Sequence, residues 1–416
     1  MKKMTRSALS RIAFLIAFSS IIFISCEKDP EIFDHQERLQ RAADSVRSGL
    51  ESMISHKVPT LSVLIQSPSG SYFACSAAEG EEKITPDTYF RFASNTKNFT
   101  ATAILNMYED GWLSLDDKIT DTIPGSALTY VPTGANWDVP YKNDISIRLL
   151  LNHGAGVYDV DNDSVPNCNG MSYVGYMLFT DPSHQFSSTE LVNQVVINDL
   201  KYFAPGEGYH YSNTGYTILG EIISRVYSFR SGTAKTCTDY LYDHVYGPSA
   251  RVPLPIHFPY LSTDQNLPSP YCCGNIIDPG PSEQALNCSN NMSAHPAEGN
   301  GYGTMKALNT YIRSLMRGEN VLHDTTVQIM QTSVNTHYPD YALGTIYITN
   351  CGYGHNGAID GYLSLMLYNP ADDVSLVCMM PMWDLRQGVN SFLMCFAAVH
   401  NLGSEARKAL GYPGKS

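Results

Sequence analysis

The stretch that decides the fold reads Arg91-Phe92-Ala93-Ser94-Asn95-Thr96-Lys97-Asn98-Phe99-Thr100. Ser94 and Lys97 are three residues apart, and residues at this spacing lie on one face of a helix. A serine hydroxyl is a poor nucleophile unless a base lies within hydrogen-bond reach, about 2.6–3.2 Å. Apolar residues continue at helical spacing up to Gly111, a suitable C-cap. The stretch therefore predicts a helix that begins beside a serine–lysine pair.

This motif is short, and it has a second interpretation. Ser94 could be a helix-capping serine and Lys97 a surface lysine. Short motifs also recur by chance, and Ser25-Cys26-Glu27-Lys28 matches the same pattern. Motifs farther along the chain are needed to decide between the two interpretations.

Two such motifs follow in order. The first is Tyr211-Ser212-Asn213, which comes after Pro205-Gly206-Glu207 and before a helical pattern; the second is His355-Asn356-Gly357. Taken singly, Tyr211 could be a packed aromatic residue, Asn213 a helix N-cap and His355 a loop histidine. Taken jointly and in this order, the three motifs predict a hydrolase site.

The three motifs together resemble the serine β-lactamase-like family, which includes class C β-lactamases, serine D-alanyl-D-alanine carboxypeptidases and related esterases. The resemblance covers roughly residues 45 to 400. Supporting stretches also look like the family, among them Gly111-Trp112-Leu113-Ser114-Leu115-Asp116-Asp117 and Ile147-Arg148-Leu149-Leu150-Leu151-Asn152-His153.

The resemblance implies a role for each motif residue. Ser94 would be the acylated nucleophile, and either Lys97 or Tyr211 would be the base. Tyr211 would also pass a proton to the leaving group and activate the deacylating water. The residues expected on the substrate and oxyanion side are Asn213, His355, Asn356, Gly357 and Ala358. The backbone N–H groups of Ser94 and Ala358 would form the oxyanion hole if Gly357-Ala358 lies on an edge strand.

The fold class expected from the segment pattern is α+β. β-type runs lie at both ends of the chain, at 61–66, 71–75, 341–349, 362–368 and 374–380. Helical patterns lie at 37–54, at 145–151, 191–200, 239–245, 304–317 and 325–332, and at 389–400. We expect one antiparallel sheet flanked by helices, with a helical lobe inserted, in the β-lactamase/transpeptidase-like arrangement. Residues 158–190 and 246–297 look irregular, and the second segment is too long for a simple connection.

The reaction is less defined than the site. His355 stands where β-lactamases of this family carry Lys, which favours a peptidase or esterase. A carboxypeptidase must hold a terminal carboxylate, and the resemblance implies an Arg for this on the strand before the His355 motif, yet residues 342–350 contain no Arg or Lys. A distant residue such as Arg317 could substitute, His355 and Asn356 could suffice, or the substrate lacks that carboxylate. The first expectation is a D-alanyl-D-alanine carboxypeptidase-like peptidase or a related D-amino-acid peptide hydrolase. The alternatives are an esterase or class C-type β-lactamase, and a non-catalytic lipoprotein that binds cell wall or senses β-lactams.

The N-terminus predicts export. Basic residues precede an apolar run, 12–24, that ends at Ser25-Cys26. The cysteine resembles the lipidated first residue of a bacterial lipoprotein, and ordinary secretion is the alternative. We expect a signal peptide at 1–25, a tether at 26–44, the hydrolase domain at 45–403 and a tail at 404–416. The protein would be lipid-anchored through Cys26 in the cell envelope, in the periplasm or at the outer membrane or cell surface.

Composition narrows the partners. The 416-residue chain has a net charge of −13 and no long basic run, so it is a poor candidate for nucleic-acid binding. Cys272, Cys273 and Cys288 lie in a Pro/Gly/Asn-rich stretch without zinc-type spacing. An exported chain permits a disulfide there. The remaining histidines, such as His153 and His295, show no ligand-like spacing, and we expect no metal and no cofactor.

Overall fold

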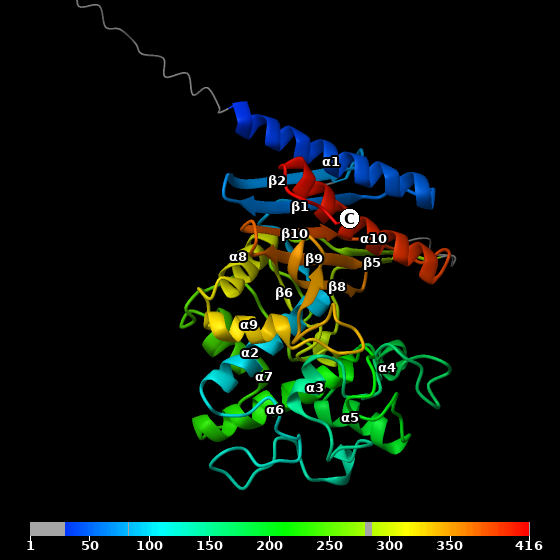
Figure 1. Cartoon of the computed structure of the whole chain (residues 1–416). Helices are drawn as coiled ribbons and strands as arrows, with labels where there is room; N and C mark the ends of the chain where they lie inside the picture. Colours follow the sequence, from blue (N-terminus) through cyan, green and yellow to red (C-terminus); the bar gives the residue numbers. More distant parts are fainter. Residues whose placement is uncertain (1–29, 82, 279–284, 416) are drawn as a thin grey trace, which may run out of the picture.

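A computed structural model of the chain describes residues 30–81, 83–278 and 285–415 (Figure 1). The predicted signal peptide and Cys26 lie outside these residues. Within them, no helix is both long and apolar enough to cross a membrane.

The centre of the fold is a six-stranded antiparallel sheet built from the two ends of the chain. Its strand order is β2-β1-β10-β9-β8-β7. The strands are β1 (Thr60–Ser67), β2 (Gly70–Ala77), β7 (Ile346–Ile348), β8 (Gly352–Ile359), β9 (Tyr362–Asn369) and β10 (Val374–Met380). The first hairpin meets the last one where Val63 lies opposite Cys378. This arrangement confirms the antiparallel sheet expected from the two terminal segments.

Two helices, α1 (Pro30–Ile54) and α10 (Val389–Ala409), cover one face of the sheet (Figure 1). Their apolar stripes are buried with the sheet residues of that face in one core cluster. Leu39 and Ala43 belong to this cluster and are fully buried. Residues 34–44, which we expected in a tether, are therefore part of a packed helix. At the other end, α10 continues to Ala409 beyond the expected end at 400.

The opposite face of the sheet carries the helical lobe. At its centre is α2 (Thr96–Glu109), in which twelve residues are buried. Around it lie α3 (Ile147–Leu151), α5 (Ser188–Ile197), α6 (Asn213–Ser231), α7 (Cys237–Tyr240), α8 (Met305–Met316) and α9 (Asp324–Thr332). A π-helical turn, η3 (Leu241–Tyr246), extends α7. These helices match the predicted ones within a few residues.

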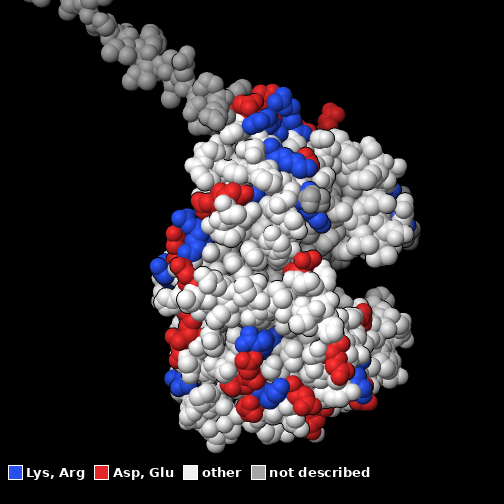
Figure 2. Space-filling model, in the orientation of Figure 1, with Lys and Arg blue, Asp and Glu red and all other residues white. Residues whose placement is uncertain are grey.

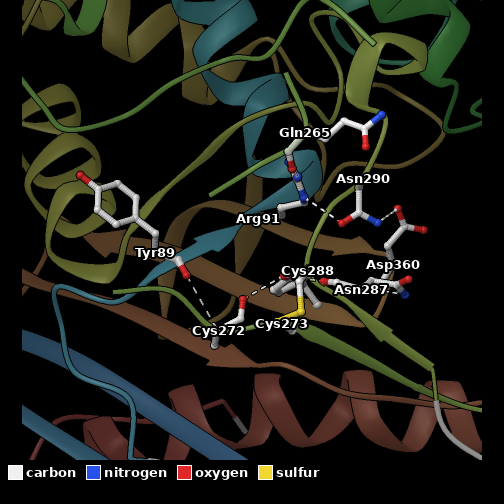
Figure 3. The surroundings of a disulfide bond; sticks show 10 residues. Tyr89, Arg91, Gln265, Cys272, Cys273, Asn287, Cys288, Asn290 and Asp360 are labelled. Carbon is white, nitrogen blue, oxygen red and sulfur yellow. Dashed lines mark hydrogen bonds between the residues drawn. A yellow bond between two sulfur atoms is a disulfide. The ribbon is translucent and has the colours of Figure 1, made fainter. Parts of the chain in front are cut away.

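Three segments differ from the prediction. The long irregular segment contains β4 (Gly274–Ile277), β5 (Ala285–Asn287) and the 3-10 turn η4 (Met292–Ala294), and Cys273 bonds to Cys288 across it (Figure 3). The polar segment before α5 contains another helix, α4 (Tyr173–Thr180). The strand expected over 341–349 is reduced to β7.

Two small sheets contain the other described strands. β3 (Tyr89–Arg91) pairs with β6 (Tyr302–Thr304), and β4 lies between β5 and β11 (Trp383–Asp384). A further 3-10 turn, η2 (Ala135–Trp137), packs against α5. Figure 2 shows the surface hollowed on its right side, between the part over the sheet and the part over the helical lobe.

Candidate active site

Ser94 sits in a strained turn between β3 and α2. The 3-10 turn η1 (Ala93–Asn95) leads directly into α2, and Ala93 has a φ of 53°. A left-handed backbone costs a non-glycine residue about 1–2 kcal/mol, and such strain is often found at functional sites. From Phe90 to Met107, Ser94 is the one residue that is not buried. The turn thus leaves this serine accessible just before the N-terminus of a buried helix.

The turn is fixed to the sheet. The Asn95 amide nitrogen donates to the carbonyl oxygen of Phe92 at 2.9 Å and to the hydroxyl of Ser364, on β9, at 2.8 Å. Gly357 of β8 lies so close that a Cβ there would come within 2.2 Å of the Phe92 carbonyl oxygen. The strand approaches the turn this closely because residue 357 has no side chain.

Lys97 lies one helical turn after Ser94, and its ammonium group is enclosed by oxygen atoms. Its Nζ is 3.2 Å from Ser94 Oγ, 2.6 Å from Asn213 Oδ1 and 2.8 Å from the carbonyl oxygen of Glu298. Glu298 Oε2 lies 3.3 Å away. A neutral amine has two hydrogens and one lone pair, so it can donate to Asn213 and the Glu298 carbonyl while it accepts from Ser94.

The surroundings shift the pKa values of the two candidate bases in opposite directions. Burial lowers the pKa of Lys97, while the nearby Glu298 carboxylate acts to raise it. Burial raises the pKa of Tyr211 well above 10, and the Ser94 hydroxyl beside it offsets this only in part. Both shifts have the sign expected when burial disfavours the charged form. Tyr211 is therefore a neutral phenol at physiological pH, whereas Lys97 loses its proton more readily than an exposed lysine.

One side of Lys97 is formed by charged groups, which we call the carboxylate wall: Asp159, Asp161, His295 and Glu298. His295 Nδ1 lies 2.7 Å from Glu298 Oε1 and 3.2 Å from Asp161 Oδ2. Asp161 Oδ2 also accepts from the Asn213 amide nitrogen at 2.6 Å. Asp159 accepts from the Asn213 backbone N–H at 3.0 Å. Burial, and to a smaller extent the Asp161 charge, raises the pKa of Asp159 to about 7.

The other side of Lys97 is formed by rings, which we call the aromatic wall: His153, Tyr211, Tyr216, Tyr341 and His355. The Tyr211 ring lies 4.3 Å from the His153 ring and 4.8 Å from Lys97 Nζ. His355 Nδ1 lies 2.6 Å from the carbonyl oxygen of Asn356 and must donate to it. Its Nε2 then accepts from the Tyr341 hydroxyl at 2.9 Å. Burial lowers the pKa of His355 to about 3, so this histidine is neutral.

The residues of the His355 motif do not all reach the same space. His355 is fully buried and contacts Tyr341 rather than an open cavity. The Asn356 amide nitrogen lies 3.4 Å from His400 Nε2, on the α10 side of the sheet. Ala358, by contrast, lines a cavity together with Ser94. β7 pairs only with residues 352–354 of β8, so the edge from 355 to 359 lies outside this pairing.

The cavity beside Ser94 has a volume of about 190 Å³. The carboxylate wall contributes Asp161, His295 and Glu298, and Asp360 adds another carboxyl group. An apolar side is formed by Val174 and Leu178 of α4, Ile359 and Trp383. Among the described residues that line it, none is Lys or Arg. The cavity is thus acidic at one side and apolar at the other.

Three residues of the carboxylate wall also form the one group of three or more potential metal ligands within the described residues. Ligand atoms of Asp161, His295 and Glu298 lie within 4.8 Å of one another. Here His295 and Lys97 already face these carboxylates at hydrogen-bond distance. While Lys97 is protonated, Lys97 and His295 balance the charges of Asp161 and Glu298, so the donor set does not call for a further cation.

Sequence reasoning brought Ser94, Lys97, Tyr211 and Asn213 to one site but missed the carboxylate wall. Asp159 and Asp161 belong to a polar stretch without periodicity, and His295 and Glu298 belong to the irregular segment. The His295-Pro-Ala-Glu298 spacing is the one local signal that could have paired two of them. Asn213 was weighed as an N-cap, but Ser212 caps α6 and leaves the Asn213 side chain for Lys97.

Comparison with known proteins identifies the family of this chain. Residues 43–381 match the Beta-lactamase family. The chain belongs to the β-lactamase family. It therefore shares the fold of a family of serine hydrolases, as the three motifs indicated.

Individual relatives support the same placement. Penicillin-binding protein 4* of Bacillus subtilis is 32% identical over 152 residues, which are 36% of this chain and 28% of that protein. The chain thus spans less than a third of the length of this curated relative. The D-amino acid amidase of Ochrobactrum anthropi SV3 superposes with a TM-score of 0.67 at 20% identity, covering 90% of this chain and 99% of the amidase.

A second solved structure is the D-stereospecific amidohydrolase of a Streptomyces species. It has a TM-score of 0.64 at 21% identity and covers 83% of this chain and 94% of the other. At these identities the structural likeness establishes the fold, which confirms the predicted α+β class and the β-lactamase-like arrangement.

Proposed function

We propose that the protein is a serine hydrolase that forms an acyl-enzyme at Ser94 and cleaves an amide bond in D-amino-acid peptides or amides. The observation that carries this proposal is the 3.2 Å contact between Ser94 Oγ and the buried Lys97 Nζ. A nucleophile within hydrogen-bond reach of an oriented base is the signature of covalent catalysis. Asn213 and Glu298 supply the orienting groups.

Lys97 is the base that the surroundings favour for the first step. It takes the Ser94 proton as Oγ attacks the carbonyl carbon. Tyr211, a neutral phenol, then donates its proton to the leaving nitrogen and is reprotonated from Lys97. The backbone N–H groups of Ser94 and Ala358 would stabilise the oxyanion, and loss of one such donor typically costs about 100- to 1000-fold in rate. A water molecule completes hydrolysis of the acyl ester.

The cavity lining favours one substrate class over the others. A D-alanyl-D-alanine carboxypeptidase must bind a terminal carboxylate, and the described lining offers no Lys or Arg for it. An amide whose far end is neutral or cationic suits an acidic cavity better. The solved structures with this fold include an amidase and an amidohydrolase named for D-configured substrates. We therefore place D-amino-acid amides and peptides ahead of carboxypeptidase, esterase and β-lactamase substrates.

The test is covalent labelling of the serine. The protein without residues 1–26 is incubated with a fluorescent fluorophosphonate and, separately, with a fluorescent penicillin, and its intact mass is measured. We expect a fluorophosphonate adduct that is absent in Ser94→Ala. The matched control is Ser293→Ala, which removes a buried hydroxyl two residues before His295 and should retain the adduct. Equal labelling of wild type and Ser94→Ala would contradict the proposal.

A second assay separates the substrate classes. D-alanine amide, D-alanyl-D-alanine and a β-lactam are compared at equal concentration. Faster cleavage of the amide supports the proposed class. Preferred cleavage of D-alanyl-D-alanine would show that the carboxylate is bound without a Lys or Arg in the described cavity lining, and the carboxypeptidase assignment would then replace ours.

We also propose that Cys26 is lipidated and holds the protein at the cell envelope. The support is the basic start, the short apolar run and the cysteine directly after it. In Cys26→Ala the protein should move from the membrane fraction to the soluble fraction. Retention of that variant in the membrane fraction would contradict lipid anchoring at this residue.

A further inference from the structure

The residues around Lys97 form a closed ring of hydrogen bonds. Lys97 donates to Asn213 Oδ1, and the Asn213 amide nitrogen donates to Asp161 Oδ2. His295 Nδ1 lies at hydrogen-bond distance from both Asp161 and Glu298. Glu298 Oε2 returns to Lys97 at 3.3 Å. Every member of the ring is thereby held by two others.

Charges alternate around this ring. Going from Lys97 through the neutral Asn213, the order is cation, carboxylate, cation, carboxylate. His295 is the second cation, and it lies between the two carboxylates. All four ionisable members are at least largely buried: Lys97 side chain is 0% exposed, Glu298 3%, His295 10% and Asp161 15%. Buried charges interact strongly because little water screens them.

We propose that His295 is a positioning residue that keeps the ring balanced when Lys97 gives up its proton, and so allows Lys97 to act as a free amine. The inference rests on the proposed function, since it assumes that Lys97 activates Ser94. When Lys97 is neutral, His295 still balances one of the two carboxylates. Without His295, a neutral Lys97 would leave two uncompensated carboxylates in a buried site. The ammonium form of Lys97 would then be favoured.

The same geometry gives His295 a second effect, on Asn213. An Asn side chain can turn its oxygen or its nitrogen toward a neighbour. Because Asp161 can only accept a hydrogen bond while ionised, it holds the Asn213 nitrogen and leaves the oxygen for Lys97. His295 keeps Asp161 ionised: burial alone would raise the pKa of Asp161, but His295 and Asn213 lower it below its usual value.

Other charged groups surround the ring from neighbouring elements. Asp159 lies two residues before Asp161 and bonds the Asn213 backbone. Asp360, after β8, is bonded by Asn290, which in turn accepts from Arg91 of β3 (Figure 3). On the aromatic wall, His153 and His355 are kept neutral by burial, which lowers the pKa of each. Apart from Lys97, His295 is therefore the cation that lies at hydrogen-bond distance from the ring carboxylates.

The experiment measures how fast Ser94 reacts with a fluorophosphonate across pH, which needs no knowledge of the substrate. Wild type and His295→Gln are compared from about pH 5 to about pH 10, a range that spans the ordinary pKa values of histidine and lysine. In His295→Gln we expect the midpoint of the rate profile to rise by about one pH unit or more. The rate at pH 7 then falls about tenfold or more, because each unit changes the free-amine fraction tenfold.

A rescue variant separates this role from a structural one. Adding Glu298→Gln to His295→Gln removes one unbalanced carboxylate, and the midpoint should move back toward wild type. A merely structural role predicts the opposite, since a second lost contact would lower the rate further at every pH. The matched control is His323→Gln: His323 Nδ1 also pairs with a carboxylate, Glu109 Oε2, at 2.9 Å, but at the far end of α2. Its profile should match wild type.

The outcomes are distinct. A shifted midpoint in His295→Gln that the double variant reverses supports the proposal. An unchanged midpoint with a lower rate at all pH values overturns it. If wild type fails to react at any pH, the proposed function is contradicted, and the role of His295 falls with it. If wild type reacts but is indistinguishable from His295→Gln, only the role of His295 is contradicted.

Discussion

The carboxylate wall and the aromatic wall both contain buried histidines, but His295 in the first is a cation whereas His355 in the second is neutral. Burial alone would lower the pKa of His295, but Asp161 and Glu298 raise it well above 6.5. His355 bonds the Tyr341 hydroxyl and a backbone carbonyl, and burial lowers its pKa to about 3. Similar burial thus gives a cation on one side of Lys97 and a neutral ring on the other. The partners of a buried histidine, rather than its depth, decide its charge.

Lys97 is tuned because it lies between these two environments. The aromatic wall excludes water and adds no negative charge, which favours the free amine. The carboxylate wall attracts the ammonium but carries its own cation, which limits that attraction. A lysine placed only among carboxylates would stay protonated, and one placed only among rings would have nothing to orient its hydrogens. The predictions below therefore test substitutions that remove Lys97 or change one of the two walls.

The largest effect is expected from replacing Lys97, which lies between the two walls. Lys97→Met keeps the length of the side chain but has no lone pair for the Ser94 proton. General-base catalysis typically contributes about 100- to 10 000-fold, so the rate of Ser94 phosphonylation should fall by a factor in this range. Stopped-flow or gel-based labelling rates measure it.

A matched lysine tests whether the loss belongs to the site. Lys235 Nζ lies 3.0 Å from the Asp243 carboxylate and 5.2 Å from the Tyr227 ring, much as Lys97 lies between Glu298 and Tyr211. Lys235→Met should label at the wild-type rate. A similar loss in both variants would show that the effect comes from destabilisation, and a wild-type rate in Lys97→Met would assign the proton transfer to another group.

A second prediction uses the different charges of His295 and His355, whose pKa values are shifted in opposite directions. A pKa of about 3 in the folded protein against 6.5 for the ordinary side chain means that the unfolded chain binds the extra proton. The stability due to neutral His355 is present above pH 6.5 and is lost as the pH falls toward 3. The loss should reach about 2 kcal/mol at pH 5. His295 has the opposite sign: its contribution is present below pH 6.5 and is lost as the pH rises through its raised pKa.

Urea unfolding of wild type and His355→Gln at pH 8 and pH 5 measures this difference. Gln can still donate to one partner and accept from the other, so the fold should persist. Between pH 8 and pH 5 the variant should lose about 2 kcal/mol less than wild type. His56→Gln changes a partly exposed histidine just before β1, provides the control and should follow wild type. Parallel pH curves for wild type and His355→Gln would mean that His355 is not held neutral.

The two walls also differ in how much of each the sequence predicted. The sequence predicted part of the aromatic wall, because Tyr211 and His355 belong to motifs of fixed spacing. The carboxylate wall was not, because Asp161 and Glu298 come from irregular segments separated by more than a hundred residues, and only the fold brings them together. Local spacing predicts contacts along one helix or strand, whereas contacts between loops depend on the tertiary packing.

The strands show the same limit. β1, β9 and β10 were predicted because their apolar residues form continuous buried runs. β8 was not predicted as a strand by its pattern, since Gly352, Gly354 and Gly357 interrupt it. The backbone of β9 and the turn before α2 approach these glycines closely: a Cβ at Gly354 would lie 1.9 Å from the Met366 carbonyl oxygen. The close packing around the site requires glycine at these positions, and glycines lack the apolar side chains from which a strand is predicted.

The smallest effect is expected where the aromatic wall ends, one residue after His355. Asn356 was expected to bind substrate, but its side chain contacts His400 and lines a separate cavity of about 610 Å³. Asn356→Ala should therefore change the Ser94 phosphonylation rate by less than about twofold, since surface changes away from a site usually have small effects. The neighbouring Gly357→Ala is the contrast, because its Cβ would meet the Phe92 carbonyl oxygen at 2.2 Å and displace the serine turn. If Asn356→Ala slowed labelling as much as Gly357→Ala, the Asn356 side chain would have to face the site rather than His400.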